Sequence, residues 1–216
     1  MDINNKVSYT DPGSNVHEFI TGDDVHSPFA NTSYAWKALL DHGIVGDAPK
    51  IADFGAGTGF LAHFAKTTYP NSVVKAYENN AVAFEYLEAN NQSGVICINE
   101  DVANVSGEDF NYIMATPPTL PETAKKVNGG HILEPEYAIF PGDERGRSAH
   151  EVFVPAVAAN LAEGGVVSYA HTEMQADFIK ELMEANGLTV LSVVVNEKES
   201  PKISPAVDLA FTIATK

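Results

Sequence analysis

The sequence has little cysteine and no long hydrophobic run. One cysteine, Cys97, occurs among 216 residues, which excludes an intramolecular disulfide. It lies in the apolar run Val95 to Ile98, so we expect a core residue and not a nucleophile. No apolar run approaches the ~20 residues that cross a bilayer, and Met1 to Thr10 lacks the hydrophobic stretch of a secretory signal. We therefore expect a cytoplasmic chain with no membrane partner.

Basic residues are also scarce. The chain has 13 Lys and Arg against 29 Asp and Glu, which makes the formal net charge −16. An acidic surface repels phosphate backbones, so a nucleic acid partner is less expected than a protein partner. The charge is equally consistent with solubility or with adaptation to a salty medium. Hydrophobic residues make up 44% of the chain, enough for the core of one sizeable domain.

The first residues differ from the rest of the chain. Residues 1–24 are rich in turn formers and acids, as in Asp11 to Asn15 and Thr21 to Asp24, so we expect an irregular lead-in. Residues 25–216 should form one domain, in which Thr32 to His42 has the apolar stripe of a helix.

Strand-like and helix-like segments alternate from residue 50 onward. Strands are expected at 50–54, 72–77, 95–99, 110–115, 166–171, 188–196 and 207–215, and helices at 59–67, 81–90, 150–161 and 174–186. Such alternation produces parallel strands joined by right-handed crossovers. The last two strands are joined by a polar, proline-containing link that is too short for a crossover helix. We therefore expect a Rossmann-like α/β fold of the class I methyltransferase type. Its sheet should be mostly parallel and seven-stranded, with a C-terminal antiparallel hairpin and helices on both faces.

A glycine-rich turn, Asp-Phe-Gly-Ala-Gly-Thr-Gly, follows the first of these strands. Ligands of open α/β sheets bind beyond the carboxyl ends of the strands, and glycines let the backbone approach them closely. An acid before the first glycine would repel the pyrophosphate that dinucleotide enzymes bind at such turns. It suits the ammonium and sulfonium of S-adenosylmethionine, although a purely structural turn remains the alternative. The expected cofactor-binding residues are Asp53, Gly55, Ala56, Gly57 and Gly59.

Two acids at later strand ends extend this hypothesis. Glu78 follows the expected strand at 72–77, where a carboxylate accepts hydrogen bonds from ribose hydroxyls. Asp101 follows the strand at 95–99 and could take an adenine amino group, while Val102 could cover the ring. An ordinary surface acid is the alternative interpretation of Asp101.

A second turn, Thr116-Pro117-Pro118-Thr119, follows the strand at 110–115. Consecutive prolines fix the backbone and remove two N–H groups, so the turn should be rigid with free carbonyls. Such a turn can hold a planar amide or amine NH₂ in line with a methyl donor. A proline kink without a function is the alternative.

Residues 25–216 resemble the HemK/PrmC family of glutamine amide-nitrogen methyltransferases, especially its short members. Val25 to Thr32 is similar to the family's Val-Tyr-x-Pro-x-x-Asp-Thr segment, and Ile51 to Leu61 to its cofactor loop. Gly142 to Arg147 resembles its Gly-Gly-x-x-Gly-Arg stretch. The resemblance implies that Thr32, Asn79 and Thr116 also lie at the cofactor.

The family's second turn reads Asn-Pro-Pro-Tyr. Its Asn oxygen and a proline carbonyl hold the substrate amide, and its Tyr packs on the amide face. Here Thr116 replaces the Asn and Thr119 replaces the Tyr, while the Pro118 carbonyl remains. The resemblance thus implies a catalytic turn of Thr116, Pro117, Pro118 and Thr119, with no metal.

The implied reaction transfers a methyl group from S-adenosylmethionine to a nitrogen, in the first place a glutamine amide of a release factor or similar protein. Short family members often work with a small zinc-binding activator subunit, so such a partner is possible.

The altered turn leaves two other functions open: methylation of an RNA or DNA base or a small molecule, and cofactor binding without catalysis. Positioning can supply most of the acceleration, so no base is required. We interpret His131, His150 and His171 as solvated or structural.

Overall fold

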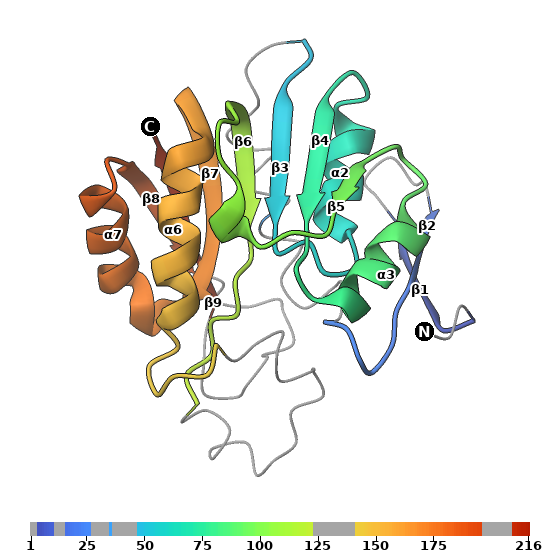
Figure 1. Cartoon of the computed structure of the whole chain (residues 1–216), viewed down its shortest axis with the longest axis horizontal. Coiled ribbons are helices and arrows are strands. Elements are labelled where there is room, and N and C mark those ends of the chain that lie inside the picture. Colours follow the sequence, from blue (N-terminus) through green and yellow to red (C-terminus); the bar gives the residue numbers. More distant parts are fainter. Residues whose placement is uncertain (1–3, 11–15, 27–34, 36–46, 123–140, 196–208) are drawn as a thin grey trace.

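The computed structural model describes residues 4–10, 16–26, 35, 47–122, 141–195 and 209–216. A seven-stranded sheet with the order β5-β4-β3-β6-β7-β9-β8 forms its centre (Figure 1). The strands are β3 (Lys50–Phe54), β4 (Val73–Tyr77), β5 (Ile96–Ile98), β6 (Phe110–Ala115), β7 (Leu161–Thr172), β8 (Thr189–Val195) and β9 (Leu209–Thr215). The helices of the described part are α2 (Phe60–Thr68), α3 (Ala81–Asn90), α6 (Ser148–Asn160) and α7 (Ala176–Ala185), with short 3-10 turns η1 (Val102–Asn104) and η2 (Glu173–Gln175).

The strand directions match the expected fold class. β3 pairs in parallel with β4 and β6, β4 with β5, and β6 with β7. β9 runs antiparallel to both β7 and β8. A mostly parallel seven-stranded sheet that ends in an antiparallel hairpin is therefore confirmed. β7 begins at Leu161 and not at 166, because Leu161 already pairs with Phe110 before an irregularity in the register.

Helices cover both faces of the sheet, and each face has its own hydrophobic core. Alternate residues of β6 separate the two cores: Tyr112 and Met114 pack with α2, while Ile113 and Ala115 pack with α6 and α7. Figure 1 shows α6 in front of the sheet and α2 behind it. The period-2 alternation of the strands thus builds a three-layer α/β/α structure.

The N-terminal lead-in is more ordered than expected. Within residues 1–24 the structure contains β1 (Lys6–Thr10) and β2 (Val16–Ile20), which form an antiparallel pair. Phe19 of β2 is 1% exposed and packs against Phe60 of α2, with ring centroids 5.0 Å apart. The turn-rich composition predicted irregular structure, but packing against α2 stabilises a hairpin. Of the expected helix at Thr32–His42, only Ala35 is among the described residues, and it is buried.

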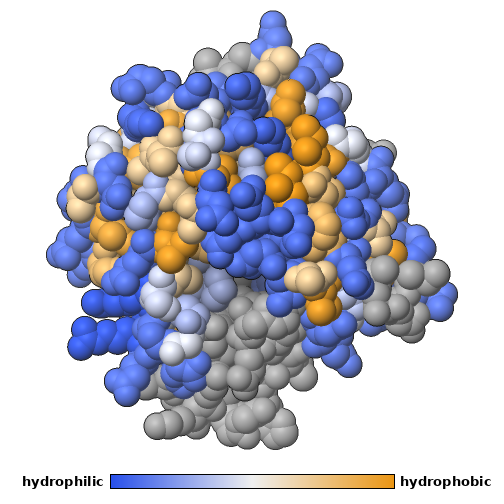
Figure 2. Space-filling model, in the orientation of Figure 1, coloured by the Kyte–Doolittle hydropathy of each residue, from blue (hydrophilic) through white to orange (hydrophobic). Residues whose placement is uncertain are grey.

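The described surface is largely polar. Hydrophilic side chains cover much of the face shown in Figure 2, with hydrophobic patches between them. No helix in the described ranges is long and apolar enough to cross a membrane. Cys97 is half-buried at the edge of the core behind the sheet, and burial raises the pKa of its thiol.

Candidate functional site

The glycine-rich turn lies at the carboxyl end of β3, between the ends of β4 and β6. The N–H groups of Gly55 and Ala56 both donate to the Tyr77 carbonyl of β4, at 3.0 Å. Gly57 has a φ of 53°, and a Cβ placed there would meet no atom of the described residues within 4 Å, so its backbone faces open space in that part of the structure. A Cβ at Gly55 would lie 3.1 Å from the Thr116 carbonyl oxygen. Glycine therefore leaves room beside the turn at one position and permits close contact with the second turn at another.

Asp53 lies beneath this turn and is fully buried. Its Oδ2 accepts a hydrogen bond of 3.0 Å from the Ala62 N–H in the first turn of α2. Its Oδ1 has no hydrogen-bond partner within the described part of the chain. Burial raises the pKa of Asp53 to about 7, against the lowering effect of the Ala62 bond. The carboxyl thus both caps α2 and retains an unused acceptor.

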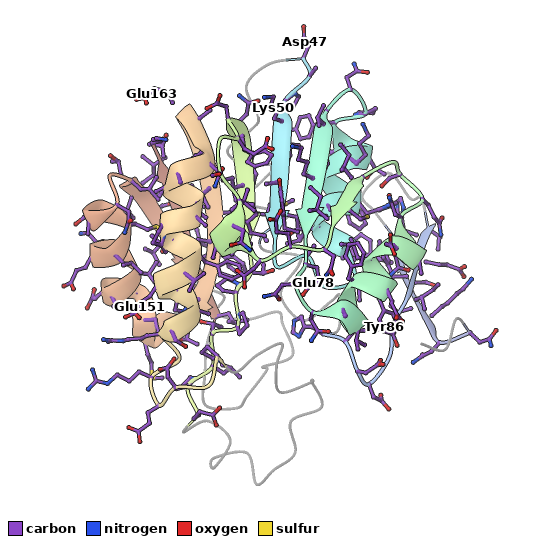
Figure 3. All side chains as sticks on the ribbon, in the orientation of Figure 1. Asp47, Lys50, Glu78, Tyr86, Glu151 and Glu163 are labelled. Carbon is purple, nitrogen blue, oxygen red and sulfur yellow. The ribbon has the colours of Figure 1, made fainter. Side chains whose placement is uncertain are left out.

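Glu78 follows β4 at the same edge of the sheet, where Figure 3 labels it at the carboxyl ends of the strands. Its Oε2 accepts from the Gly57 N–H at 2.9 Å, and its Oε1 accepts from the Asn80 N–H at 2.8 Å. The side chain is 9% exposed. Burial raises its pKa, although the Asn80 and Gly57 hydrogen bonds oppose the shift. Because a carboxylate has about four acceptor sites, each oxygen can accept a further bond.

The residues expected to hold an adenine lie together beside Glu78. Asp101 Oδ2 accepts from the Asn79 amide at 3.0 Å, and its Oδ1 accepts from the Ala103 N–H at the start of η1. Val102 is 4% exposed and packs into the core in front of the sheet. Thr32 lies outside the described residues. A contact of any of these residues with a cofactor remains a prediction.

The second turn begins where β6 ends, next to the glycine-rich turn. The Thr116 N–H donates to the Phe54 carbonyl at 3.1 Å, and its hydroxyl donates to the Gly55 carbonyl at 3.0 Å. Pro117 is buried, and Pro118 is partly exposed. The structure therefore brings the two sequence-predicted turns into direct hydrogen-bond contact.

The Thr119 side chain is buried, and its expected part in an acceptor site remains a prediction. It is 6% exposed, and its hydroxyl donates to Gln175 Oε1 at 2.7 Å. The Thr119 hydroxyl oxygen also lies 3.1 Å from His150 Nε2. The hydroxyl hydrogen is already donated, so the imidazole must be the donor in that contact. Thr119 thus has its hydroxyl inside a buried polar network.

His150 and His171 are both structural. The His150 ring lies between Thr119 and Tyr169, whose hydroxyl is 2.9 Å from Nδ1. His171 contacts the Thr172 carbonyl and the Thr212 hydroxyl. Burial lowers the pKa of each histidine to about 4. Both rings are therefore neutral at pH 7, as structural groups and not as solvated ones. His131 lies outside the described residues.

The segment before α6 is tied to the second turn. Asp143 accepts from the backbone N–H groups of Arg145, Arg147 and Ser148. Partial burial favours a higher pKa for Asp143, but the bonds from Ser148, Arg147 and Arg145 hold it well below its usual range. The Asp143 carbonyl also accepts from the Glu122 N–H at 3.2 Å.

Sequence reasoning missed Gln175 and Asp143. Both had local signals that a sequence can show. Thr172 and Gln175 have the spacing of a capping box, which the structure contains, and Asp143 precedes a helix start. The partners of Gln175, however, include Thr119, which lies 56 positions away in the chain, and no local spacing predicts that contact.

Comparisons with known proteins show which proteins this chain is similar to. Residues 30–133 match the methyltransferase small domain family. The M. jannaschii TYW2 structure in complex with AdoMet has a TM-score of 0.62 at 17% identity, over 97% of this chain and 85% of the other. The P. horikoshii TYW2 structure in complex with MeSAdo has a TM-score of 0.64 at 15% identity, over 98% and 71%. The fold is that of the class I methyltransferases.

The expected family resemblance is confirmed by curated relatives. A release factor glutamine methyltransferase of Xylella fastidiosa is 26% identical over 162 residues, which are 72% of this chain and 57% of the relative. One of Coxiella burnetii is 28% identical over 169 residues, 76% of this chain and 60% of the relative. The chain thus spans 57% and 60% of the length of these two relatives.

Proposed function

We propose that this chain is an S-adenosylmethionine-dependent methyltransferase whose acceptor is a nitrogen, in the first place a glutamine side-chain amide of a release factor or similar protein. The observation that carries the proposal is the hydrogen bond from the Thr116 hydroxyl to the Gly55 carbonyl, at 3.0 Å. It joins the proline turn directly to the glycine-rich turn, which supports an acceptor site next to a donor site. The names of the curated relatives support the amide acceptor.

The residues of the glycine-rich turn fit S-adenosylmethionine. Among the described residues, open space lies beside Gly57, while the Asp53 carboxyl lies beneath the turn and the Glu78 carboxyl accepts from the Gly57 N–H. Carboxylates favour the cationic end of this cofactor over a pyrophosphate. Asp53 Oδ1, which lacks a partner among the described residues, is the acceptor that a nearby ammonium would use. Glu78 would hold the ribose hydroxyls through the acceptor sites that Gly57 and Asn80 leave free.

The bound cofactor supplies an electrophilic methyl group on a sulfonium. The task of the protein is to hold the acceptor nitrogen in line with the bond between methyl and sulfur. The Pro118 carbonyl would accept a hydrogen from the acceptor NH₂, with the Thr116 oxygen as a second acceptor. The new N–C bond uses the nitrogen lone pair, the C–S bond electrons stay on sulfur, and the nitrogen proton leaves to water. Since the buried histidines are neutral and internally bonded, positioning is the contribution that these residues can make.

A methyl-transfer assay tests the proposal. Radiolabelled S-adenosylmethionine is supplied with a purified release factor that contains Gly-Gly-Gln, with the same factor carrying Gln→Ala, and with total RNA. We expect label in the release factor that disappears with the Gln→Ala change. Glu78→Ala should abolish labelling, and Glu85→Ala, an exposed glutamate of α3, should not.

The other outcomes are equally clear. Label in RNA or in small molecules alone would replace the glutamine acceptor with another one. Binding of S-adenosylhomocysteine without transfer to any of these acceptors would contradict methyl transfer and leave cofactor binding. A small activator subunit could be required, so the assay is repeated with a cell extract.

A further inference from the structure

A buried side-chain amide joins three segments that surround the proposed acceptor site. Gln175 lies in η2, between β7 and α7, and is 4% exposed. Its Nε2 lies 3.0 Å from the Thr119 carbonyl, 2.8 Å from the Gly146 carbonyl and 3.1 Å from the Arg145 carbonyl. One amide group thus holds the end of the second turn and the segment that leads into α6.

The orientation of this amide is set by its surroundings. Its nitrogen faces three backbone carbonyls, which can only accept hydrogen bonds. Its oxygen accepts from the Thr119 hydroxyl at 2.7 Å and from the Thr172 N–H at 2.9 Å. A flipped amide would place oxygen against three carbonyls, so only one orientation is favourable. The side chain therefore needs both a donor end and an acceptor end.

Neighbouring groups also contact the Thr119 side chain and the 145–147 segment. Tyr169 of β7 lies against His150, whose other nitrogen contacts the Thr119 hydroxyl. The Arg147 guanidinium lies over the Phe178 ring of α7, 4.3 Å from its centroid. A Cβ at Gly146 would come within 2.6 Å of the Thr119 carbonyl oxygen. The turn and the segment are therefore packed against each other and against the C-terminal half of the sheet.

We propose that Gln175 is a positioning residue for methyl transfer: through Thr119 it sets the direction of the Pro118 carbonyl relative to the glycine-rich turn. This inference rests on the proposed function, because it concerns the acceptor turn of that site. Gln175 makes no described contact with Asp53, Glu78 or the glycines of the glycine-rich turn, so it should govern the acceptor and not the cofactor. The Thr119 hydroxyl has the same role, since it is directed into the network.

The test compares the two glutamines of the chain. Gln175→Glu keeps the shape and one acceptor oxygen but replaces the donor nitrogen with an oxygen that faces three carbonyls. Gln92→Glu makes the same chemical change at an exposed position after α3. We expect Gln175→Glu to lower kcat for the release factor on the order of 10- to 100-fold, as for a displaced reacting group. The affinity for S-adenosylhomocysteine should stay within about twofold, and Gln92→Glu should behave as wild type.

A second pair of variants covers the case in which Gln175→Glu does not fold. Thr119→Val removes the hydroxyl at nearly constant volume, and Thr119→Ser keeps it. Thr119→Ser should retain more of kcat than Thr119→Val. In the same samples, amide hydrogen exchange should become faster in residues 119–122 and 145–147 of Gln175→Glu and unchanged in residues 53–62.

Each result decides the matter. If the wild type methylates the release factor and Gln175→Glu has the kcat of Gln92→Glu, the inference is overturned and the proposed function stands. If Gln175→Glu and Thr119→Val each lose kcat, cofactor affinity and melting temperature together, Gln175 has only a structural role and the inference is overturned. If the wild type transfers no methyl group, the proposed function fails, and unchanged exchange at 119–122 would overturn the holding role of Gln175 as well. Faster exchange at 119–122 in Gln175→Glu would show that Gln175 holds the second turn even though no acceptor had been found.

Discussion

The glycine-rich turn and the proline turn lie side by side, yet they are held by different chemistry. The first is held by buried carboxyl groups: Asp53 and Glu78 accept backbone N–H groups of Ala62, Gly57 and Asn80. Each carboxyl group lies within 21 positions of the N–H groups from which it accepts. Because the groups are ionisable, the geometry of this turn is coupled to pH and to the charge of a ligand.

The second turn is held by neutral groups. A side-chain amide, a neutral imidazole and hydroxyls surround Thr119, and its partner Gln175 is 56 positions away. These groups have no charge to change near pH 7, so the turn should keep its shape when the ligand or the pH changes. If the proposed function holds, the donor site should respond to charge and the acceptor site beside it should be rigid. Four experiments test this difference between the two turns.

The largest expected effect is on the carboxylate of the first turn. Glu78→Ala removes two charge-assisted hydrogen bonds, each worth about 1.5–3 kcal/mol, and removes the proposed ribose acceptor. We expect S-adenosylhomocysteine to bind about 100-fold more weakly by calorimetry. Glu85→Ala on the exposed face of α3 is the matched control. Equal affinities for both variants would show that Glu78 does not contribute to the site.

The next effect concerns the pH dependence of donor binding. Burial raises the pKa of Asp53 to about 7. Below that pH the carboxyl is mostly protonated, so a cationic ligand that needs the carboxylate must displace the carboxyl proton in order to bind. S-adenosylmethionine affinity should rise up to about tenfold per pH unit between pH 6 and 7 and level off above it. Asp53→Asn keeps an acceptor for the Ala62 N–H but should bind the cofactor about tenfold more weakly at pH 8. A wild-type affinity that is flat from pH 6 to 8 contradicts this role.

The pKa shifts of Asp53 and of the two buried histidines predict opposite effects of pH on the free energy of unfolding. Asp53 binds its proton more tightly in the folded state, so its contribution to stability is present below pH 3.8 and is lost as pH rises to about 7. His150 and His171 have folded pKa values of about 4 against 6.5, so their contribution is lost as pH falls from 6.5 to 4. Asp53→Asn should therefore steepen the rise of stability between pH 4.5 and 6.5 by about 1.4 kcal/mol per pH unit. Urea unfolding at several pH values measures it, and parallel curves for the two proteins would refute the shift.

The smallest effect is on the contact between the two turns. Thr116→Val removes one neutral hydrogen bond to the Gly55 carbonyl, worth about 0.5–1.5 kcal/mol. We expect kcat to fall about three- to tenfold and S-adenosylhomocysteine affinity to change less. Thr116→Ser, which keeps the hydroxyl, should lose less activity than Thr116→Val. Identical kcat values for the two variants would mean that this bond does not align the turns.

Much of the fold could be predicted from the sequence because its signals are local. The period of apolar residues located β3, β4, β6, α2 and α3, and the short polar link after residue 196 predicted the antiparallel pair β8–β9. The N-terminal hairpin was missed for the opposite reason. Its strands are short and lie among turn-forming residues, and they are stabilised by distant packing such as that of Phe19 on Phe60.

The site shows the same division. The positions of the glycine-rich turn, Glu78 and the proline turn could be predicted from the sequence, because each lies at a strand end and parallel strands bring those ends to one edge. The directions of their side chains depend on the tertiary structure. It turned Thr119 inward, left Asp53 Oδ1 without a described partner and brought the Gln175 amide to three carbonyls. Those contacts depend on the register of β6 with β7 and on the packing of α6 with α7, which no local pattern encodes.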